Sequence, residues 1–134
     1  MKSDKEILKT VELEIKGNTI YLKFIENLED IEENIRLSEL MVEQIRSKID
    51  ESPGVVFNFI FDVLPIRMNA TTPSITRKNY LSLAKDPQIG RIAVVGGNIT
   101  VKTIVNFAMA ATGKKGNMKL FDRRKEALEW INNG

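Results

Sequence analysis

Few side chains in this 134-residue chain offer chemistry, because the sequence contains no cysteine and no histidine. Thiolate or imidazole metal sites, cysteine nucleophiles and Ser-His relays are therefore excluded. Asp62 is the one carboxylate in an otherwise apolar strand region, and no second carboxylate lies at a spacing typical of an acid-base pair. We therefore expect no catalytic residues, no metal site and no cofactor, and we expect that the protein is not an enzyme.

Two groups of polar residues follow predicted strands and precede predicted helices. In a parallel sheet, the carboxyl ends of strands meet the amino ends of the next helices, where free N–H groups favour an anion. We interpret both groups as candidate ligand or switch sites. The first comprises Asp62, Thr71, Thr72 and Ser74, and the second comprises Gly96, Gly97, Asn98, Thr100 and Lys102.

A simpler interpretation of both groups is structural. Thr72 and Asn98 are typical helix caps, each contributing about 1 kcal/mol, while Gly96 and Gly97 serve a turn. The spacing of a phosphate-binding P-loop is absent around these glycines. A third interpretation is a phosphate on Thr72 or Ser74, whose negative charge a helix start would favour, although capping without modification is simpler.

The last predicted helix begins with the basic residues Arg123-Arg124-Lys125. Positive charges in a first helical turn oppose the helix dipole by a few tenths of a kcal/mol each. We expect Asp122, as the cap, together with Glu126 and Glu129, to offset them. The alternative is an acidic partner or a bound anion.

The elements that position these residues follow from hydrophobic periodicity. Apolar residues alternate with polar ones over 7–15 and again over 20–24, and Gly17-Asn18 between them is a typical two-residue turn. This pattern predicts a β-hairpin, with Ile7 sharing the parity of its first strand. Apolar residues at three- and four-residue steps over 28–50 then predict an amphipathic helix.

The rest of the chain alternates strands and helices. Stretches 55–61 and 92–95 are apolar on both parities, which is typical of strands covered on both faces. The helix predicted over 99–112 is apolar almost all round, so we expect it to pack tightly on the sheet. The order β-β-α-β-α-β-α-β-α predicts an α/β fold with a mixed, mostly parallel five-stranded sheet, in which the N-terminal hairpin gives an antiparallel edge.

Composition indicates one domain with a charge asymmetry. Residues 1–54 hold 8 basic and 13 acidic residues, whereas residues 55–134 hold 12 and 5. This asymmetry indicates either an acidic helix on a basic body or a dipolar surface that self-associates. We expect no nucleic-acid partner, no secretory leader, no membrane span and a cytoplasmic location.

Four segments in the second half of the chain carry a resemblance to a known family: Ile92-Ala93-Val94-Val95-Gly96, residues 101–107, Lys119-Leu120-Phe121 and residues 125–131. They resemble the STAS-like superfamily, in particular small bacterial and archaeal proteins with the anti-sigma-factor antagonist fold. The similarity is strongest over 88–132 and rests on element order before that. It implies one STAS-like domain over residues 1–134 that is non-catalytic and acts through protein contacts.

The chain departs from one motif of that superfamily. Anti-sigma-factor antagonists carry an Asp-Ser-Ser-Gly-like signature after the third strand, in which a partner kinase phosphorylates a serine. Here Asp62 is followed by Val63-Leu64-Pro65-Ile66-Arg67, without a hydroxyl. The resemblance therefore does not carry this phosphorylation switch over to the chain.

Two functional hypotheses follow. The first is a regulatory or protein-interaction module that contacts an unknown protein or a second copy of itself as a homodimer. The second is a small-ligand binding protein that holds a lipid-like or anionic molecule between the sheet and the helix formed by residues 72–85.

Overall fold

The computed structural model describes residues 1–66, 72–114 and 116–133, with the backbone alone at 99 and 100. Five strands form one sheet in the order β1-β2-β3-β4-β5, in which β1 and β2 are antiparallel and every other pair is parallel. The predicted mixed sheet with an antiparallel hairpin at one edge is thus confirmed. The strands are β1 (Val11–Lys16), β2 (Thr19–Phe24), β3 (Phe57–Asp62), β4 (Ile89–Val95) and β5 (Met118–Phe121).

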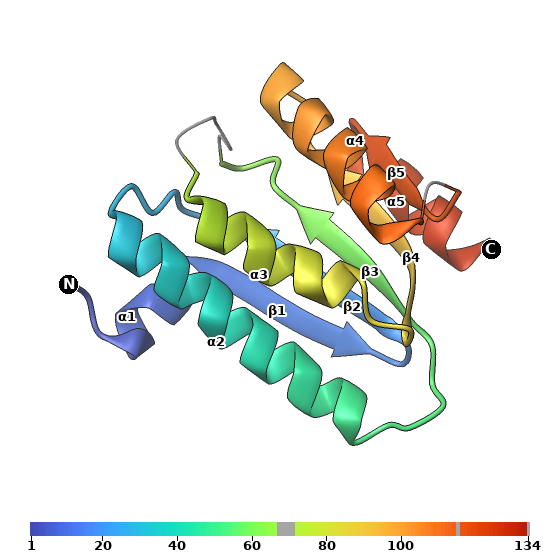
Figure 1. Cartoon of the computed structure of the whole chain (residues 1–134), viewed down its shortest axis with the longest axis horizontal. Coiled ribbons are helices and arrows are strands. Elements are labelled where there is room, and N and C mark those ends of the chain that lie inside the picture. The colour runs from blue at the N-terminus through green and yellow to red at the C-terminus, as the bar shows by residue number, and fades with distance from the viewer. Residues whose placement is uncertain (67–71, 115, 134) are drawn as a thin grey trace.

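The helices divide unequally between the two faces of the sheet. Figure 1 shows α2, α3 and α4 on one face, here called the front, and α5 on the back. The larger hydrophobic core lies on the front, whereas a smaller one joins α5 to β3, β4 and β5. The helices are α1 (Asp4–Leu8), α2 (Ile31–Asp50), α3 (Ser74–Ala84), α4 (Ile99–Thr112) and α5 (Arg124–Asn132).

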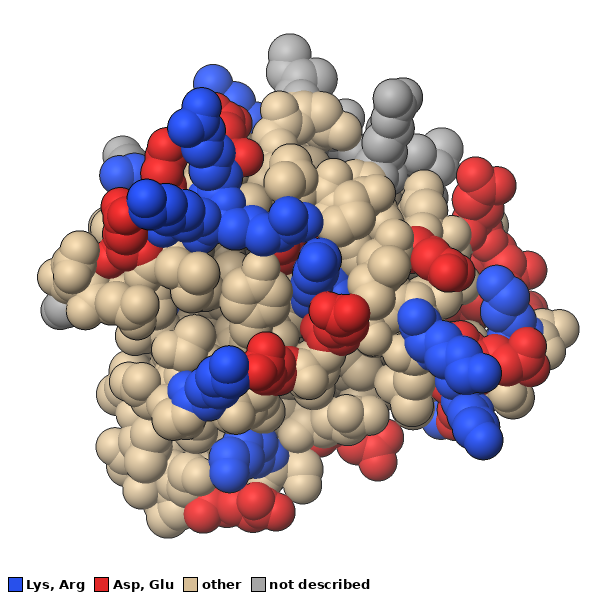
Figure 2. Space-filling view, turned by 180° about the vertical axis from the view of Figure 1, so that it is seen from behind, with Lys and Arg blue, Asp and Glu red and all other residues tan. Residues whose placement is uncertain are grey.

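The alternation of side chains along β3 decides which residues meet which helices. Phe59 and Phe61 belong to the front core, while Ile60 packs in the back core and Asp62 shares its parity. Both faces of this central strand are therefore covered, as its continuous apolar sequence predicts. The back of the molecule carries basic and acidic side chains of both signs (Figure 2).

The helix α1 differs from the predicted extension of the first strand. Ser3 caps this helix, because its hydroxyl accepts from the Glu6 N–H while the Glu6 carboxylate accepts from the Ser3 N–H. This reciprocal arrangement is a capping box, which stabilises a short helix start. Ile7 is fully buried from the helix, not from the strand. The alternating pattern that Ile7 shares with Val11 therefore wrongly indicated that Ile7 belongs to the first strand.

The helix α4 has the predicted bounds but does not pack tightly all round. Its described side chains include only two buried ones, Val101 and Val105, and Phe107 is 68% exposed. The explanation is that α3 and α4 stand apart over the sheet, so that part of the apolar surface of α4 faces the space between them. This separation creates the groove described below.

Candidate functional site

The buried carboxylate of Asp62 lies at the centre of a polar cluster behind the sheet. The Tyr21 hydroxyl donates to Oδ2 at 2.9 Å, and the Leu64 N–H donates to Oδ1 at 3.1 Å. The Arg124 side chain donates to the same Oδ2 from the first turn of α5. Asp62 is fully buried and Arg124 is 37% exposed, so α5 is held to the sheet through a partly desolvated ion pair.

The electrostatics of this cluster follow from its geometry. Burial, followed by the hydrogen bond to Asp62, raises the pKa of Tyr21 to about 12, so the hydroxyl stays protonated and donates. The hydrogen bond to Asp62 likewise raises the pKa of Arg124. The donors from Tyr21, Leu64 and Arg124 therefore join β2, the segment after β3 and α5 at a single buried carboxylate.

The contacts of Asp62 differ from what we expected for the positive charges at the start of α5, which Asp122, Glu126 and Glu129 were predicted to offset. The N-cap position is Arg123, which makes no side-chain capping bond, so Asp122 does not cap the helix. Asp62, which is 62 residues away in sequence, is the ion-pair partner of Arg124. The charge that opposed the helix dipole is therefore offset by a strand residue and not by residues of the helix itself.

The second group of predicted site residues forms the turn between β4 and α4. Gly96 has a φ of 114°, and an added Cβ would lie 3.0 Å from the backbone nitrogen of Leu64, so only glycine fits. A Cβ on Gly97 would lie 3.2 Å from an Asp122 carboxylate oxygen, and that negative charge disfavours an anion at this corner. Lys102 is exposed on α4. The geometry of this group supports the structural interpretation.

Of the two predicted caps, Asn98 is confirmed and Thr72 is wrong. The Asn98 side chain accepts from the Val101 N–H at 2.9 Å. At α3 the N-cap position is Pro73, which has no side-chain capping bond, so Thr72 lies one residue too early. Thr71 and the side chain of Thr100 lie outside the described residues.

The difference between these caps gives a stability prediction. Asn98→Ala is expected to lower the free energy of unfolding by about 1 kcal/mol, because it leaves the Val101 N–H without its acceptor. Thr72→Ala should change it by less than about 0.5 kcal/mol, since no capping bond is lost. Urea denaturation of both variants measures the two values. Equal losses would contradict the assignment of the caps.

An apolar groove lies between α3 and α4, and strands β3 and β4 form its floor. Its volume is about 470 Å³. Phe59 and Phe61 line it from β3, Ile92 and Val94 from β4, and Met118 from β5. It lies on the front of the sheet, on the opposite side from Asp62. The sequence analysis placed a small-ligand site between the sheet and the helix of residues 72–85, but it did not predict that α4 forms the other wall, because it assigned the whole circumference of α4 to packing.

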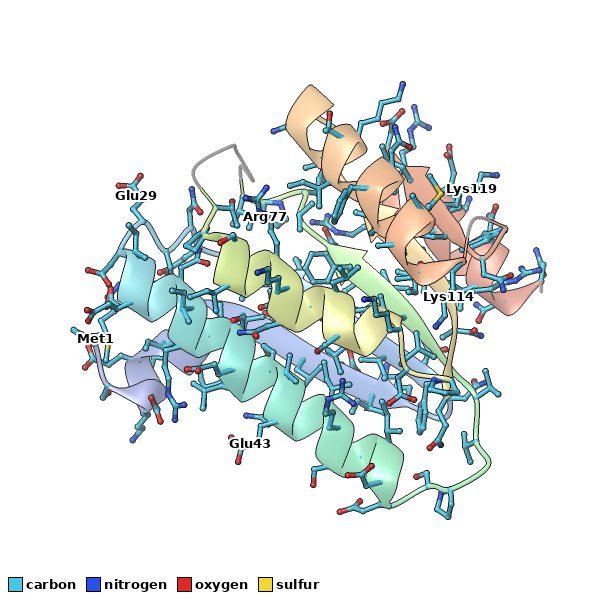
Figure 3. All side chains as sticks on the ribbon, viewed as in Figure 1. Met1, Glu29, Glu43, Arg77, Lys114 and Lys119 are labelled. Carbon is cyan, nitrogen blue, oxygen red and sulfur yellow. The ribbon has the colours of Figure 1, made fainter. Side chains whose placement is uncertain are left out.

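Polar residues line the groove at the amino end of α3. Thr72 and Ser74, two of the predicted site residues, contribute hydroxyls there, and Arg77 and Lys78 contribute the cations. Figure 3 shows Arg77 near the amino end of α3, on the side of the gap toward α4. No carboxylate lines the groove among the described residues. The groove therefore combines an apolar floor with a basic rim.

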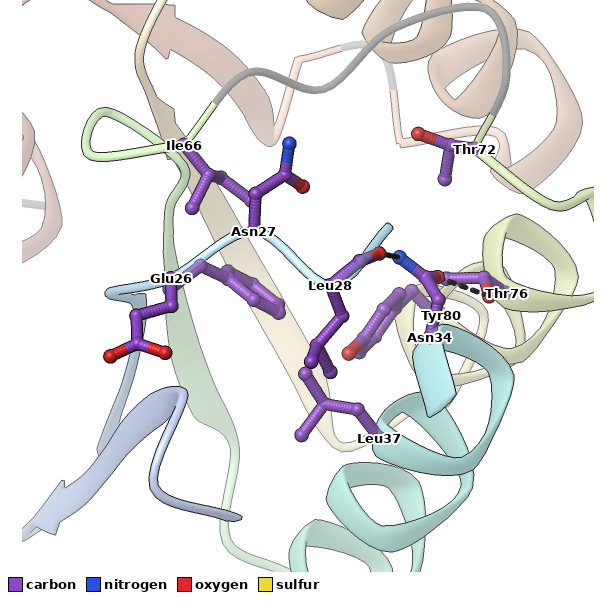
Figure 4. A pocket seen from close by; sticks show the side chains of 10 residues that line it. Glu26, Asn27, Leu28, Asn34, Leu37, Ile66, Thr72, Thr76 and Tyr80 are labelled. Atoms are coloured by element: carbon purple, nitrogen blue, oxygen red, sulfur yellow. Dashed lines mark hydrogen bonds between the residues drawn. The ribbon is translucent and has the colours of Figure 1, made fainter. Parts of the chain in front are cut away.

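A small cavity of about 40 Å³ adjoins the groove and shares Thr72, Thr76 and Tyr80 with it. Figure 4 shows the hydrogen-bonded chain behind it: the Thr76 hydroxyl donates to Asn34, whose amide donates to the Leu28 carbonyl. The Tyr80 ring packs edge-on against Phe24 and Phe61, and burial raises the pKa of its hydroxyl. These contacts fix the wall that separates the groove from α2.

The predicted site residues therefore separate into three places. Thr72 and Ser74 line the groove, Asp62 lies in the cluster behind the sheet, and Gly96 to Lys102 form and follow the turn into α4. Arg77 and Lys78 were not predicted, since a basic pair on a helix is an ordinary surface feature. Within the described ranges, no group of three acidic side chains gathers as a metal site would need, and no helix has the length and hydropathy to cross a membrane.

Comparison with known proteins completes the description of this arrangement. No curated protein and no solved structure matches the chain significantly. A family model described as SpoIIAA-like matches residues 27–132, which include the strands β3, β4 and β5 and all of α2 to α5, but not the hairpin of β1 and β2. With its mixed sheet, antiparallel hairpin and parallel remainder, the chain belongs to the SpoIIAA-like family, a STAS-like fold.

Proposed function

We propose that the protein is a non-enzymatic binding protein whose groove holds a small amphiphile with an apolar chain and an anionic end. The observation that carries this proposal is the groove between α3 and α4, whose volume of about 470 Å³ lies within the usual range for small-molecule sites. Its lining is mostly aliphatic and aromatic. Burial of an apolar chain there is favourable by about 0.8 kcal/mol per methylene.

The charge of the rim supports an anionic end group. Arg77 and Lys78 both line the groove, and neither α3 nor α4 contains an acidic residue. A carboxylate or sulfate at the amino end of α3 would therefore meet cations and hydroxyls without a competing negative charge. A cationic head group would meet repulsion there, which excludes the corresponding class of ligand.

The rim is tested by a double substitution, Arg77→Gln with Lys78→Gln. Affinity for dodecanoate should fall by roughly 10-fold, because two partly solvated charges each contribute up to about 1 kcal/mol. Affinity for 1-dodecanol, which has the same chain and no charge, should be unchanged. Displacement of a fluorescent probe from the groove measures both affinities.

The control for this test is Lys125→Gln, which removes an exposed cation from α5 on the opposite face. It should alter neither affinity. If the double variant bound both ligands as the unchanged protein does, the anionic part of the proposal would be wrong. If the unchanged protein bound neither ligand, the proposed function itself would be wrong.

A second candidate function is a regulatory module that contacts another protein or a second copy of this chain. Two exposed apolar side chains favour it: Phe107 on α4 is 68% exposed and Ile75 on α3 is 52% exposed. Sedimentation equilibrium of the unchanged protein and of Phe107→Ser tests self-association. A dimer that the substitution dissociates would support this candidate, and a monomer in both cases would count against a homodimer.

A further inference from the structure

A lysine joins the carboxyl-terminal end of α4 to the turn after α3. Both α3 and α4 follow the carboxyl ends of parallel strands, so both helices end at the opposite edge of the sheet. Lys114, two residues beyond α4, donates from Nζ to the carbonyls of Asp86, at 3.1 Å, and Ile89. Figure 3 shows Lys114 at the end of α4 that is far from Arg77.

The turn that receives Lys114 is itself firmly held. Arg46 of α2 donates to the Asp86 carboxylate at 3.2 Å and to the Ser82 carbonyl at 3.0 Å. The Gln88 side chain donates to the carbonyls of Ser52 and Val55 at 2.8 and 2.9 Å. The turn whose carbonyls accept from Lys114 is therefore held in place by hydrogen bonds to α2 and to the segment before β3.

The second half of α4 packs less closely than the first half, because Ala108 and Met109 are only partly buried against the front core. Its two buried side chains, Val101 and Val105, both lie in the first half. Phe107, Ala110 and Ala111 are exposed. Lys114 is thus a polar contact that joins the carboxyl-terminal end of α4 to the turn after α3. Burial lowers its pKa, in keeping with an ammonium withdrawn from water.

We infer that Lys114 closes the groove at this end and thereby limits the length of the apolar chain that it accepts. The inference rests on the proposed function and adds an orientation to it. The anionic end of the ligand lies at Arg77 and Lys78, and the chain points toward Ile89, whose side chain lines the groove and whose carbonyl accepts from Lys114. Lys114 is a positioning residue, since it does not line the groove itself.

The test is a chain-length series of saturated fatty acids, from octanoate to stearate, measured by probe displacement. For the unchanged protein, affinity should rise by up to about fourfold per added methylene and then stop rising when the chain reaches the closed end. Lys114→Met keeps a long side chain but loses the donors. This variant should continue to gain affinity with chains longer than the limit of the unchanged protein.

Two further variants keep the result interpretable. Lys114→Arg retains the charge and the donors and should restore the original limit, whereas Lys125→Met on α5 should leave the limit unchanged. The same limit in Lys114→Met as in the unchanged protein would overturn the role of Lys114 while leaving the proposed function intact. Failure of the unchanged protein to bind any fatty acid would instead refute the proposed function and this inference with it.

Discussion

Arg124→Met is expected to lower the free energy of unfolding by about 3 kcal/mol, the largest loss that we predict for a single substitution. The Asp62 carboxylate is fully buried, and Arg124 is its only cationic partner among the described residues. Removal of one member of a buried ion pair leaves an uncompensated charge, which typically costs 3 kcal/mol or more. The Tyr21 hydroxyl and the Leu64 N–H remain as donors, so the carboxylate keeps part of its stabilisation.

The neighbouring arginine provides the control. Arg123→Met removes an equal charge from an exposed residue without a side-chain capping bond and should cost less than about 0.5 kcal/mol. The double variant Asp62→Asn with Arg124→Met should recover part of the loss, because a neutral amide needs no cation. Urea midpoints give all three values. A similar cost for the two arginines would show that the Asp62 cluster does not hold α5.

Ala108→Trp is expected to lower the affinity for dodecanoate by about 100-fold or more. Ala108 lines the groove from α4, and an indole in its place would occupy the volume that the ligand chain needs. A loss of about 100-fold corresponds to some 2.7 kcal/mol, which is the burial of roughly three to four methylenes. Probe displacement measures this affinity directly.

Ala111→Trp is the matched control, because Ala111 is exposed on the same helix and does not line the groove. Its affinity for dodecanoate should equal that of the unchanged protein. Thermal unfolding of both variants shows whether either substitution disturbs the fold. An Ala108→Trp protein that is stable and binds dodecanoate normally would place the ligand elsewhere.

Much of the fold could be predicted because its signals are local and periodic. The bounds of α4 agree with the predicted range of 99–112, and β1 and β2 form the predicted hairpin. Apolar residues on both parities of β3 and β4 indicated strands covered on both faces, and the burial of residues on both parities in two separate cores confirms it. The family match over 27–132 extends beyond the range 88–132 where the sequence resemblance was strongest.

The incorrect predictions arose where two local sequence patterns favoured different structures, or where tertiary packing determined the position of an element. Ile7 fits the parity of β1, but the capping box of Ser3 and Glu6 specifies a helix. The spacing of Ser3 and Glu6 was a signal that could have identified α1. Thr72 is typical of a helix cap by residue type, yet Pro73 occupies the cap position and the helix begins at Ser74.

The candidate site was only partly predictable, because its contacts are long-range. Asp62 was identified from its place in an apolar strand, but its partners Tyr21 and Arg124 lie 41 and 62 residues away. No spacing rule connects such residues before the sheet is assembled. The groove between α3 and α4 depends on the distance between two helices, which hydrophobic periodicity does not determine.

Native mass spectrometry in the presence of dodecanoate tests the central claim most directly. The 15.2-kDa chain should appear with one bound dodecanoate, and the Ala108→Trp protein should appear without it. A bare polypeptide in both samples would contradict the existence of a binding groove. Equal occupancy of the two proteins would show that dodecanoate binds somewhere other than between α3 and α4.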